Sequence, residues 1–249
     1  MASKSSMSSD ILGNLVKFNS QTAGREKLLR LVQYGTRMLW ALMEKYSHEK
    51  EVVFRLKNLE YTFSTARKLF RFGRSLDVFY SALSTINIPD QILRITITFS
   101  RINLALYLLA DHVLWLGQAG IANVSKDKWS KLSNRFWLYS LVMNLVRDMY
   151  EILTLLQIQG SQTCAVSVSS VFPYARSSWS VLLQALLNWM IYHRSVTVEL
   201  IKNGCDFWIP LTNLKIVKFS PATVGILGVL SSLAGILQLI NVSYKLSPS

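Results

Sequence analysis

Apolar residues recur at alternating steps of three and four along most of the chain, the spacing of one face of an α-helix. The first such stripe consists of Leu28, Val32, Gly35, Leu39, Leu42 and Tyr46. A second stripe consists of Leu132, Phe136, Tyr139, Met143, Val146, Tyr150 and Leu153. Strand-like alternation is scarce, so the pattern predicts an all-α fold.

Residues 61–83, YTFSTARKLFRFGRSLDVFYSAL, combine an apolar stripe with a basic one. At 100° per residue, one side carries Leu69, Phe72, Leu76, Phe79 and Leu83. The opposite side carries Arg67, Arg71 and Arg74, with Lys68 at the border and Phe70 beside the arginines. We therefore expect one amphipathic helix here, ending before Pro89.

The last long apolar segment has no charged residue between Lys218 and Lys245. Ser220 can cap a helix and Pro221 suits its first position, and a helix from there to about residue 242 is roughly 33 Å long. The hydrocarbon core of a bilayer is about 30 Å thick, so this segment is predicted to be a transmembrane helix. Its small residues form a groove on one face that favours close helix packing: Gly225, Gly228, Ser232 and Gly235.

A candidate membrane segment covers residues 96–122, either crossing the bilayer or lying deep in its interface. Between positions 102 and 125 the ionisable residues are Asp111 and His112, which we interpret as a buried polar pair. Asp111 is expected to pair with a cation of the helix bundle, such as Arg101 or Arg147. A solute pathway is the alternative role for this intramembrane carboxylate.

Three regions follow from these segments. Residues 1–94 are predicted to be a cytosolic region of amphipathic helices, and residues 219–249 hold the terminal span and a short tail. Residues 95–218 are predicted to be a membrane-associated helical region with a Ser-rich linker at 160–178. After the linker, we expect a helix from about Ser178 to Gly204.

Composition separates the partners that a basic chain could have. Lys and Arg total 27 against 14 acidic residues, which indicates an anionic partner. Charged residues are only 16% of the chain and hydrophobic residues 51%, which favours an anionic phospholipid membrane and not nucleic acid. Three scattered His residues, two Cys and no Gly-rich phosphate loop predict no catalytic residues, no metal and no cofactor.

Three readings compete for residues 61–83: a packed surface helix, a nucleic-acid contact and a helix in the lipid interface. Four cations near an anionic leaflet contribute about 1 kcal/mol each. Half-burial of four large apolar side chains adds about half of the 1.5–3 kcal/mol available for each. Because lipid satisfies both sides of the helix, we expect it to bind membrane and to bend it.

Four stretches in order resemble the peroxin-eleven family, from about Phe18 to Tyr244. They are GREKLLRLVQYGTRML near the start, ARKLFRFGRSLDVF in the amphipathic segment, NLALYLLADHVLWLG in the candidate membrane segment, and KNGCDFWIPL with VGILGVLSSLAGI near the end. Matching positions in the middle two are Arg67, Lys68, Phe70, Arg71, Gly73, Leu76, Tyr107, Asp111, His112 and Trp115.

The resemblance implies a non-enzymatic peroxisomal membrane protein that elongates peroxisomes and promotes their proliferation and fission. It also implies two cytosolic termini, homo-oligomers, and cooperation with fission adaptors and a dynamin-like GTPase. The family is also suspected of passing small solutes, so a small-solute channel or pore is the alternative function.

Overall fold

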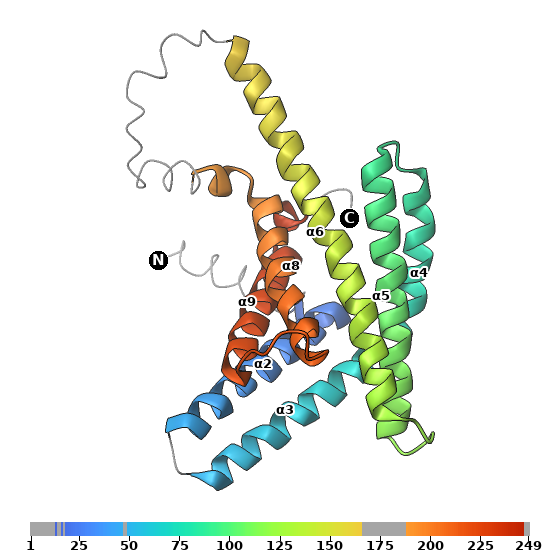
Figure 1. Cartoon of the computed structure of the whole chain (residues 1–249), viewed down its shortest axis with the longest axis vertical. Coiled ribbons are helices and arrows are strands. Elements are labelled where there is room, and N and C mark those ends of the chain that lie inside the picture. Colours follow the sequence, from blue (N-terminus) through green and yellow to red (C-terminus); the bar gives the residue numbers. More distant parts are fainter. Residues whose placement is uncertain (1–12, 14–15, 17, 47–48, 166–187, 247–249) are drawn as a thin grey trace.

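The computed structural model in Figure 1 describes residues 13, 16, 18–46, 49–165 and 188–246. Within these residues the chain forms helices and no strand, so the predicted all-α class is confirmed. The long helices are α2 (Thr22–Tyr46), α3 (Lys50–Phe70), α4 (Arg74–Ser84), α5 (Gln91–Gln118), α6 (Lys126–Ala165), α8 (Arg194–Asn213) and α9 (Pro221–Ile240).

The helices form one elongated bundle. α5 and α6 form a long hairpin, and α4 runs back along the outer side of α5 (Figure 1). α2 packs against α9 and forms a second hairpin with α3, while α8 lies against both α6 and α9. The hairpin of α2 and α3 projects at the lower end of the bundle in this view.

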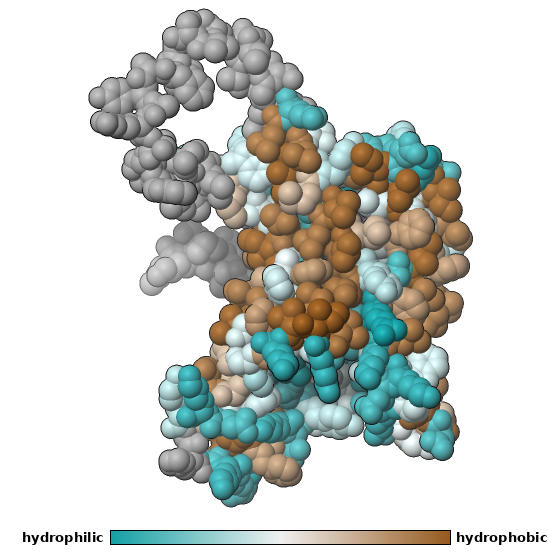
Figure 2. Space-filling view, viewed as in Figure 1, coloured by the Kyte–Doolittle hydropathy of each residue, from teal (hydrophilic) through white to brown (hydrophobic). Residues whose placement is uncertain are grey.

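The bundle has a polar interior and an apolar exterior. On α2 the buried side chains include Glu26, Arg30 and Gln33, while Leu39 of the predicted apolar stripe is 50% exposed. Leu28, Val32, Leu42 and Tyr46 of the same stripe are exposed as well. Figure 2 shows apolar residues gathered over the middle and upper parts of α5 and α6, with hydrophilic residues at the lower end. An apolar outer surface of this extent is typical of a protein immersed in lipid.

The buried apolar core is correspondingly small. One cluster joins Tyr34 of α2, Ile209 of α8 and Val224 of α9, with Trp137 and Val229 packed against it. These residues hold α2, α8 and α9 together at one level of the bundle. Elsewhere, ion pairs, hydrogen bonds and the close packing of small residues also connect the helices.

Two helices of the described chain are long and apolar enough to cross a membrane, namely α5 and α9. α9 begins as predicted, because the Ser220 hydroxyl oxygen accepts a hydrogen bond from the Thr223 backbone N–H at 3.1 Å and Pro221 is its first residue. α5 begins after Pro89, where the Asp90 carboxylate accepts hydrogen bonds from the backbone N–H groups of Ile92 and Leu93.

The small residues of α9 face α2. A Cβ atom added at Gly225 would lie 2.7 Å from the Met38 backbone nitrogen, and one at Gly228 would lie 2.2 Å from the Tyr34 ring. The Gly235 position lies beside Lys27, and Ser232 is fully buried. The groove therefore packs against a helix of the same chain.

Three predicted boundaries differ from the structure. The single helix expected over residues 61–83 is two helices, because Gly73 adopts a left-handed conformation (φ 80°) between α3 and α4. α6 continues six residues into the predicted linker 160–178, to Ala165. α8 runs past Gly204 to Asn213, so Gly204 does not end it; Ser178 and the rest of the linker lie outside the described residues.

Candidate functional site

The apolar side of α4 points outward from the bundle. Leu76 is 72% exposed, and Phe79 and Leu83 are each about half exposed. The buried side of α4 is formed by small residues, Ser75 and Ala82, which pack toward α5. A short helix that buries small side chains and exposes large apolar ones needs an apolar partner outside the protein.

Phe72 is exposed but also packs against α5. Its ring lies 4.8 Å from the His112 ring and 6.1 Å from the Trp115 ring, measured between centroids. It therefore packs on α5 while more than half of its surface remains exposed. Leu69 and Phe70, near the end of α3, are also exposed.

Only part of the basic side of this region points toward solvent. This corrects the prediction that all four cations bind headgroups. Arg67 is buried, pairs with Glu26 at 2.8 Å and donates to Gln33 at 2.6 Å. Arg71 is buried and pairs with Asp111. Lys68 is partly buried at the interior, and Arg74 is exposed, so Arg74 is the cation of the four that remains fully accessible.

Arg71 connects the end of α3 to α5. Its guanidinium donates to the Tyr107 hydroxyl at 2.6 Å and to the Asp111 carboxylate at 2.7 Å, and its carbonyl oxygen lies 2.9 Å from His112 Nε2. Asp111 and His112 are thus both buried, and both contact Arg71. The expected partners of Asp111 were wrong: Arg101 bonds to the Ser81 carbonyl oxygen, and Arg147 pairs with Asp148 and Glu199.

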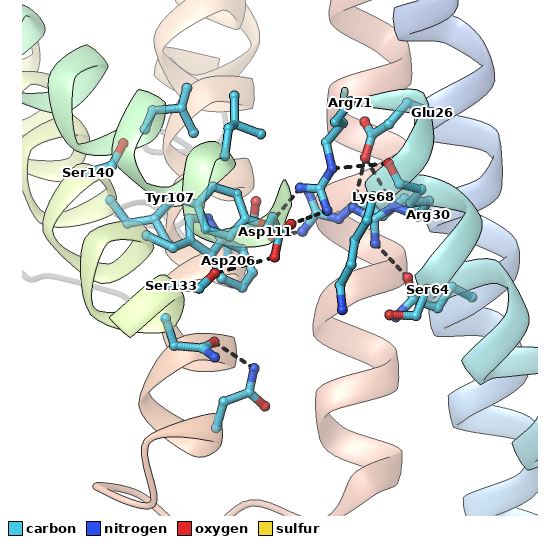
Figure 3. A pocket seen from close by; sticks show the side chains of 18 of the residues that line it. Glu26, Arg30, Ser64, Lys68, Arg71, Tyr107, Asp111, Ser133, Ser140 and Asp206 are labelled. Atoms are coloured by element: carbon cyan, nitrogen blue, oxygen red, sulfur yellow. Dashed lines mark hydrogen bonds and ion pairs between the residues drawn. The ribbon is translucent and has the colours of Figure 1, made fainter. Parts of the chain in front are cut away.

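Further ion pairs cross the bundle interior. Arg30 of α2 pairs with Asp206 of α8, and both side chains are buried. Asp148 of α6 accepts a hydrogen bond from Asn203 at 2.6 Å. Figure 3 shows such side chains from α2, α3, α5, α6 and α8 converging on one space.

That space is a cavity of about 410 Å³. Its lining extends along α6 from Ser130 to Asn144, which corresponds to about 21 Å of helix. Eight cationic side chains and three carboxylates line it. In a membrane protein, charged side chains characteristically face such an interior and pair with one another.

Burial and neighbouring charges shift the pKa values of Glu26, Lys27 and Lys68 at this cavity. Burial lowers the pKa of Lys27 to about 8, and burial also lowers the pKa of Lys68. For Glu26, burial alone would raise the pKa, but Arg67 and Lys27 outweigh burial and hold the pKa well below its usual range. Glu26 therefore stays ionised at neutral pH.

Sequence reasoning missed the interior residues Glu26, Arg30, Gln33, Asn203 and Asp206. The signal was present, because polar residues on α2 recur at 26, 30, 33 and 37, and those on α8 at 199, 203 and 206. These steps of three and four are as regular as those of the apolar stripes.

No group of three or more potential metal-ligating side chains occurs in the part of the chain that the structure describes.

Comparison with known proteins gives consistent matches over almost the whole chain. The family model described as Peroxisomal biogenesis factor 11 matches residues 12–240. The chain is similar to Peroxisomal membrane protein 11B of Homo sapiens, at 32% identity over 94% of this chain and 98% of the relative. It is also similar to Peroxisomal membrane protein 11A of Bos taurus, at 32% identity over 93% and 97% of the two chains. No solved structure gives a significant match.

Proposed function

Because the chain belongs to the peroxisomal biogenesis factor 11 family and is therefore a peroxisomal membrane protein, we propose that it bends and elongates the peroxisomal membrane through α4. The observation that carries this proposal is the outward apolar side of α4, formed by Leu76, Phe79, Tyr80 and Leu83. Half-burial in lipid contributes about half of the 1.5–3 kcal/mol available for each large apolar side chain.

The position of α4 supports a wedge that fills one leaflet. α4 has 11 residues and is about 16 Å long, close to half of the 30 Å hydrocarbon thickness. It runs antiparallel to the first part of α5, where the Thr85 and Thr98 hydroxyls lie 2.8 Å apart and Arg101 contacts Ser81. If α5 crosses the bilayer, α4 adds cross-section to the leaflet at the amino end of α5.

The direction of bending follows from the orientation of α5. With the amino-terminal region in the cytosol, α4 expands the cytosolic leaflet, and an expanded outer leaflet favours outward tubules. Arg74 is the exposed cation available to attract anionic headgroups, with about 1 kcal/mol. The ion pairs of Arg67 and Arg71 hold the wedge against the bundle.

Self-association and recruitment of fission adaptors and a dynamin-like GTPase remain predictions of the family resemblance.

Leu76→Glu tests the wedge. The charge is expected to weaken insertion of α4, so cells that express the variant should form few elongated peroxisomes while the protein still reaches the organelle. The measurement is the length of peroxisomes by fluorescence microscopy at matched expression. Ser84→Glu, at an exposed polar position of the same helix, is the matched control and should leave elongation unchanged. Normal tubules with Leu76→Glu would rule out this role of α4.

Solute passage is the second candidate function, favoured by the polar cavity. Its length of about 21 Å covers roughly two thirds of a 30 Å hydrocarbon core. A cavity lined mainly by charged and polar side chains has the polarity that a solute path requires. Conductance of the purified full-length chain in planar bilayers tests this function, and a silent bilayer at high protein density would argue against it.

A further inference from the structure

The cavity has more positive charge than its own carboxylates neutralise. Its three carboxylates are Glu26, Asp111 and Asp206, and each is held by one arginine, Arg67, Arg71 and Arg30 respectively. Two other lining cations have carboxylate partners outside the cavity wall: Arg37 pairs with Glu60, and Lys202 pairs with Glu199.

Two lysines at the cavity make no ion pair with any described residue, namely Lys27 of α2 and Lys68 of α3. Lys68 has one long hydrogen bond, 3.4 Å to the Gln118 side-chain oxygen. In Figure 3 its side chain extends into the space between α3 and the helix that carries Tyr107 and Asp111. Lys27 lies beside Gly235 of α9, and Lys68 lies near the end of α5, so the two lysines line the cavity from different helices.

A second observation points to an absent ligand. Arg30 is 5% exposed, and its Nε has no hydrogen-bond partner among the described residues. An unsatisfied buried donor is costly, so the native protein is expected to supply an acceptor at this place. Arg30 therefore offers a donor to a group bound in the cavity, on the same helix as Lys27.

From these groups we propose that the cavity binds a phosphate group. A phosphate ester carries about −1.5 to −2 charges at pH 7, which complements Lys27 and Lys68, and lysine binds phosphate as a point charge. Enclosed cationic walls of low dielectric concentrate an anion of this kind. The volume of about 410 Å³ lies within the range of small-molecule sites, so a phosphate ester fits and not only an ion.

The same chemistry has two sources, the headgroup of a phospholipid or a soluble phosphate compound. Hydroxyl and amide groups of the wall, including Tyr107, Ser64 and Ser133, can hydrogen-bond either one. The site depends neither on membrane bending by α4 nor on conduction, because it is defined by the interior cations. Its presence and the wedge are therefore tested by different variants.

The experiment uses the full chain in a maltoside detergent without phosphate, and follows thermal unfolding by tryptophan fluorescence. Inorganic phosphate and short-chain phosphatidic acid are titrated separately, with sodium chloride at equal ionic strength as the reference. We expect a saturable rise in Tm above the chloride reference, because a ligand that binds the folded state stabilises it. A response to both probes or to inorganic phosphate identifies the phosphate group, and a response to phosphatidic acid alone identifies a headgroup site.

The variant Lys27→Gln/Lys68→Gln should raise the phosphate Kd at least about tenfold. Its unliganded Tm should equal or exceed that of the wild type, since two uncompensated charges are removed. Lys45→Gln/Lys50→Gln changes the net charge equally, at exposed positions of α2 and α3, and should bind phosphate normally. Lys27→Arg/Lys68→Arg keeps both charges and should retain phosphate binding. This variant serves as the test if the glutamine pair does not fold. No rise in Tm with either probe, or an unchanged Kd in the glutamine pair, would overturn the proposal.

Discussion

At the scale of single residues, the bundle depends on arginines that the sequence presents as a basic surface. Arg67 and Arg71 each hold one carboxylate of another helix, Glu26 on α2 and Asp111 on α5. Ions enclosed in a low-dielectric interior need such partners, because an unpaired buried charge costs several kcal/mol. These two residues therefore attach α3 to the rest of the bundle instead of binding lipid headgroups.

Removing one member of the Arg67–Glu26 pair should destabilise the protein strongly. We expect Glu26→Gln and Arg67→Met each to cost about 3–5 kcal/mol, because each leaves one enclosed charge unpaired. The double variant should cost much less than the sum of the two. The measurement is a double-mutant cycle of unfolding free energies in detergent. Arg55→Gln, which breaks the exposed Arg55–Glu51 pair, is the control and should have little effect. Strictly additive costs would contradict the ion pair.

At the scale of helices, close packing of α2 on α9 fixes the bundle. The α9 glycines leave room for the α2 backbone and the Tyr34 ring, which is how small residues bring helices together where lipid removes the hydrophobic driving force. The break between α3 and α4 is the other decisive local feature. Gly73 at φ 80° ends one helix direction and allows α4 to follow α5.

Gly225→Ala should loosen this helix pair. Its methyl group would lie 2.7 Å from the Met38 backbone nitrogen, and backbone cannot move aside as a side-chain end can. We expect a loss of about 1–3 kcal/mol, measured as a lower Tm of the purified chain. Gly35→Ala on α2 meets no atom within 4 Å and should be neutral or stabilising by up to about 1 kcal/mol. Equal effects of the two substitutions would refute the close contact.

At the scale of the whole molecule, the distribution of polar and apolar side chains is the reverse of that in a soluble helix bundle. Side chains that water would stabilise, such as Glu26, Arg30 and Asp206, lie within, while Leu39 and Phe79 lie outside. A bilayer around the exterior and a polar space within satisfy both sets. The amphipathic helices α2 and α3 belong to this same bundle, since α2 packs along the candidate span α9.

Two antiparallel spans predict where the termini lie. If α5 and α9 both cross the bilayer, tags at the two termini should be digested together by protease on intact peroxisomes. A tag in the loop 119–125, between α5 and α6, should be protected until detergent is added. The measurement is immunoblotting of each tag after proteolysis. A loop tag that is digested together with the termini would show that α5 does not cross.

The sequence by itself determined the helical class, the start of α9 at Ser220 and Pro221, and the two candidate spans. These follow from periodicity, capping and the length of apolar runs, which are local properties. It also gave the apolar side of α4, because Leu76, Phe79 and Leu83 share one helix face whatever surrounds them.

Only the tertiary structure decided which side of each helix points inward. An amphipathic pattern such as that of α2 has the same period whether its apolar side meets a protein core or lipid, so the sequence leaves the choice open. Packing also decided the partners, since Asp111 pairs with Arg71, 40 residues away, and not with Arg101 or Arg147. The polar cavity exists because helices from α2 to α8 turn charged and polar side chains to one space, and no local pattern can specify that meeting.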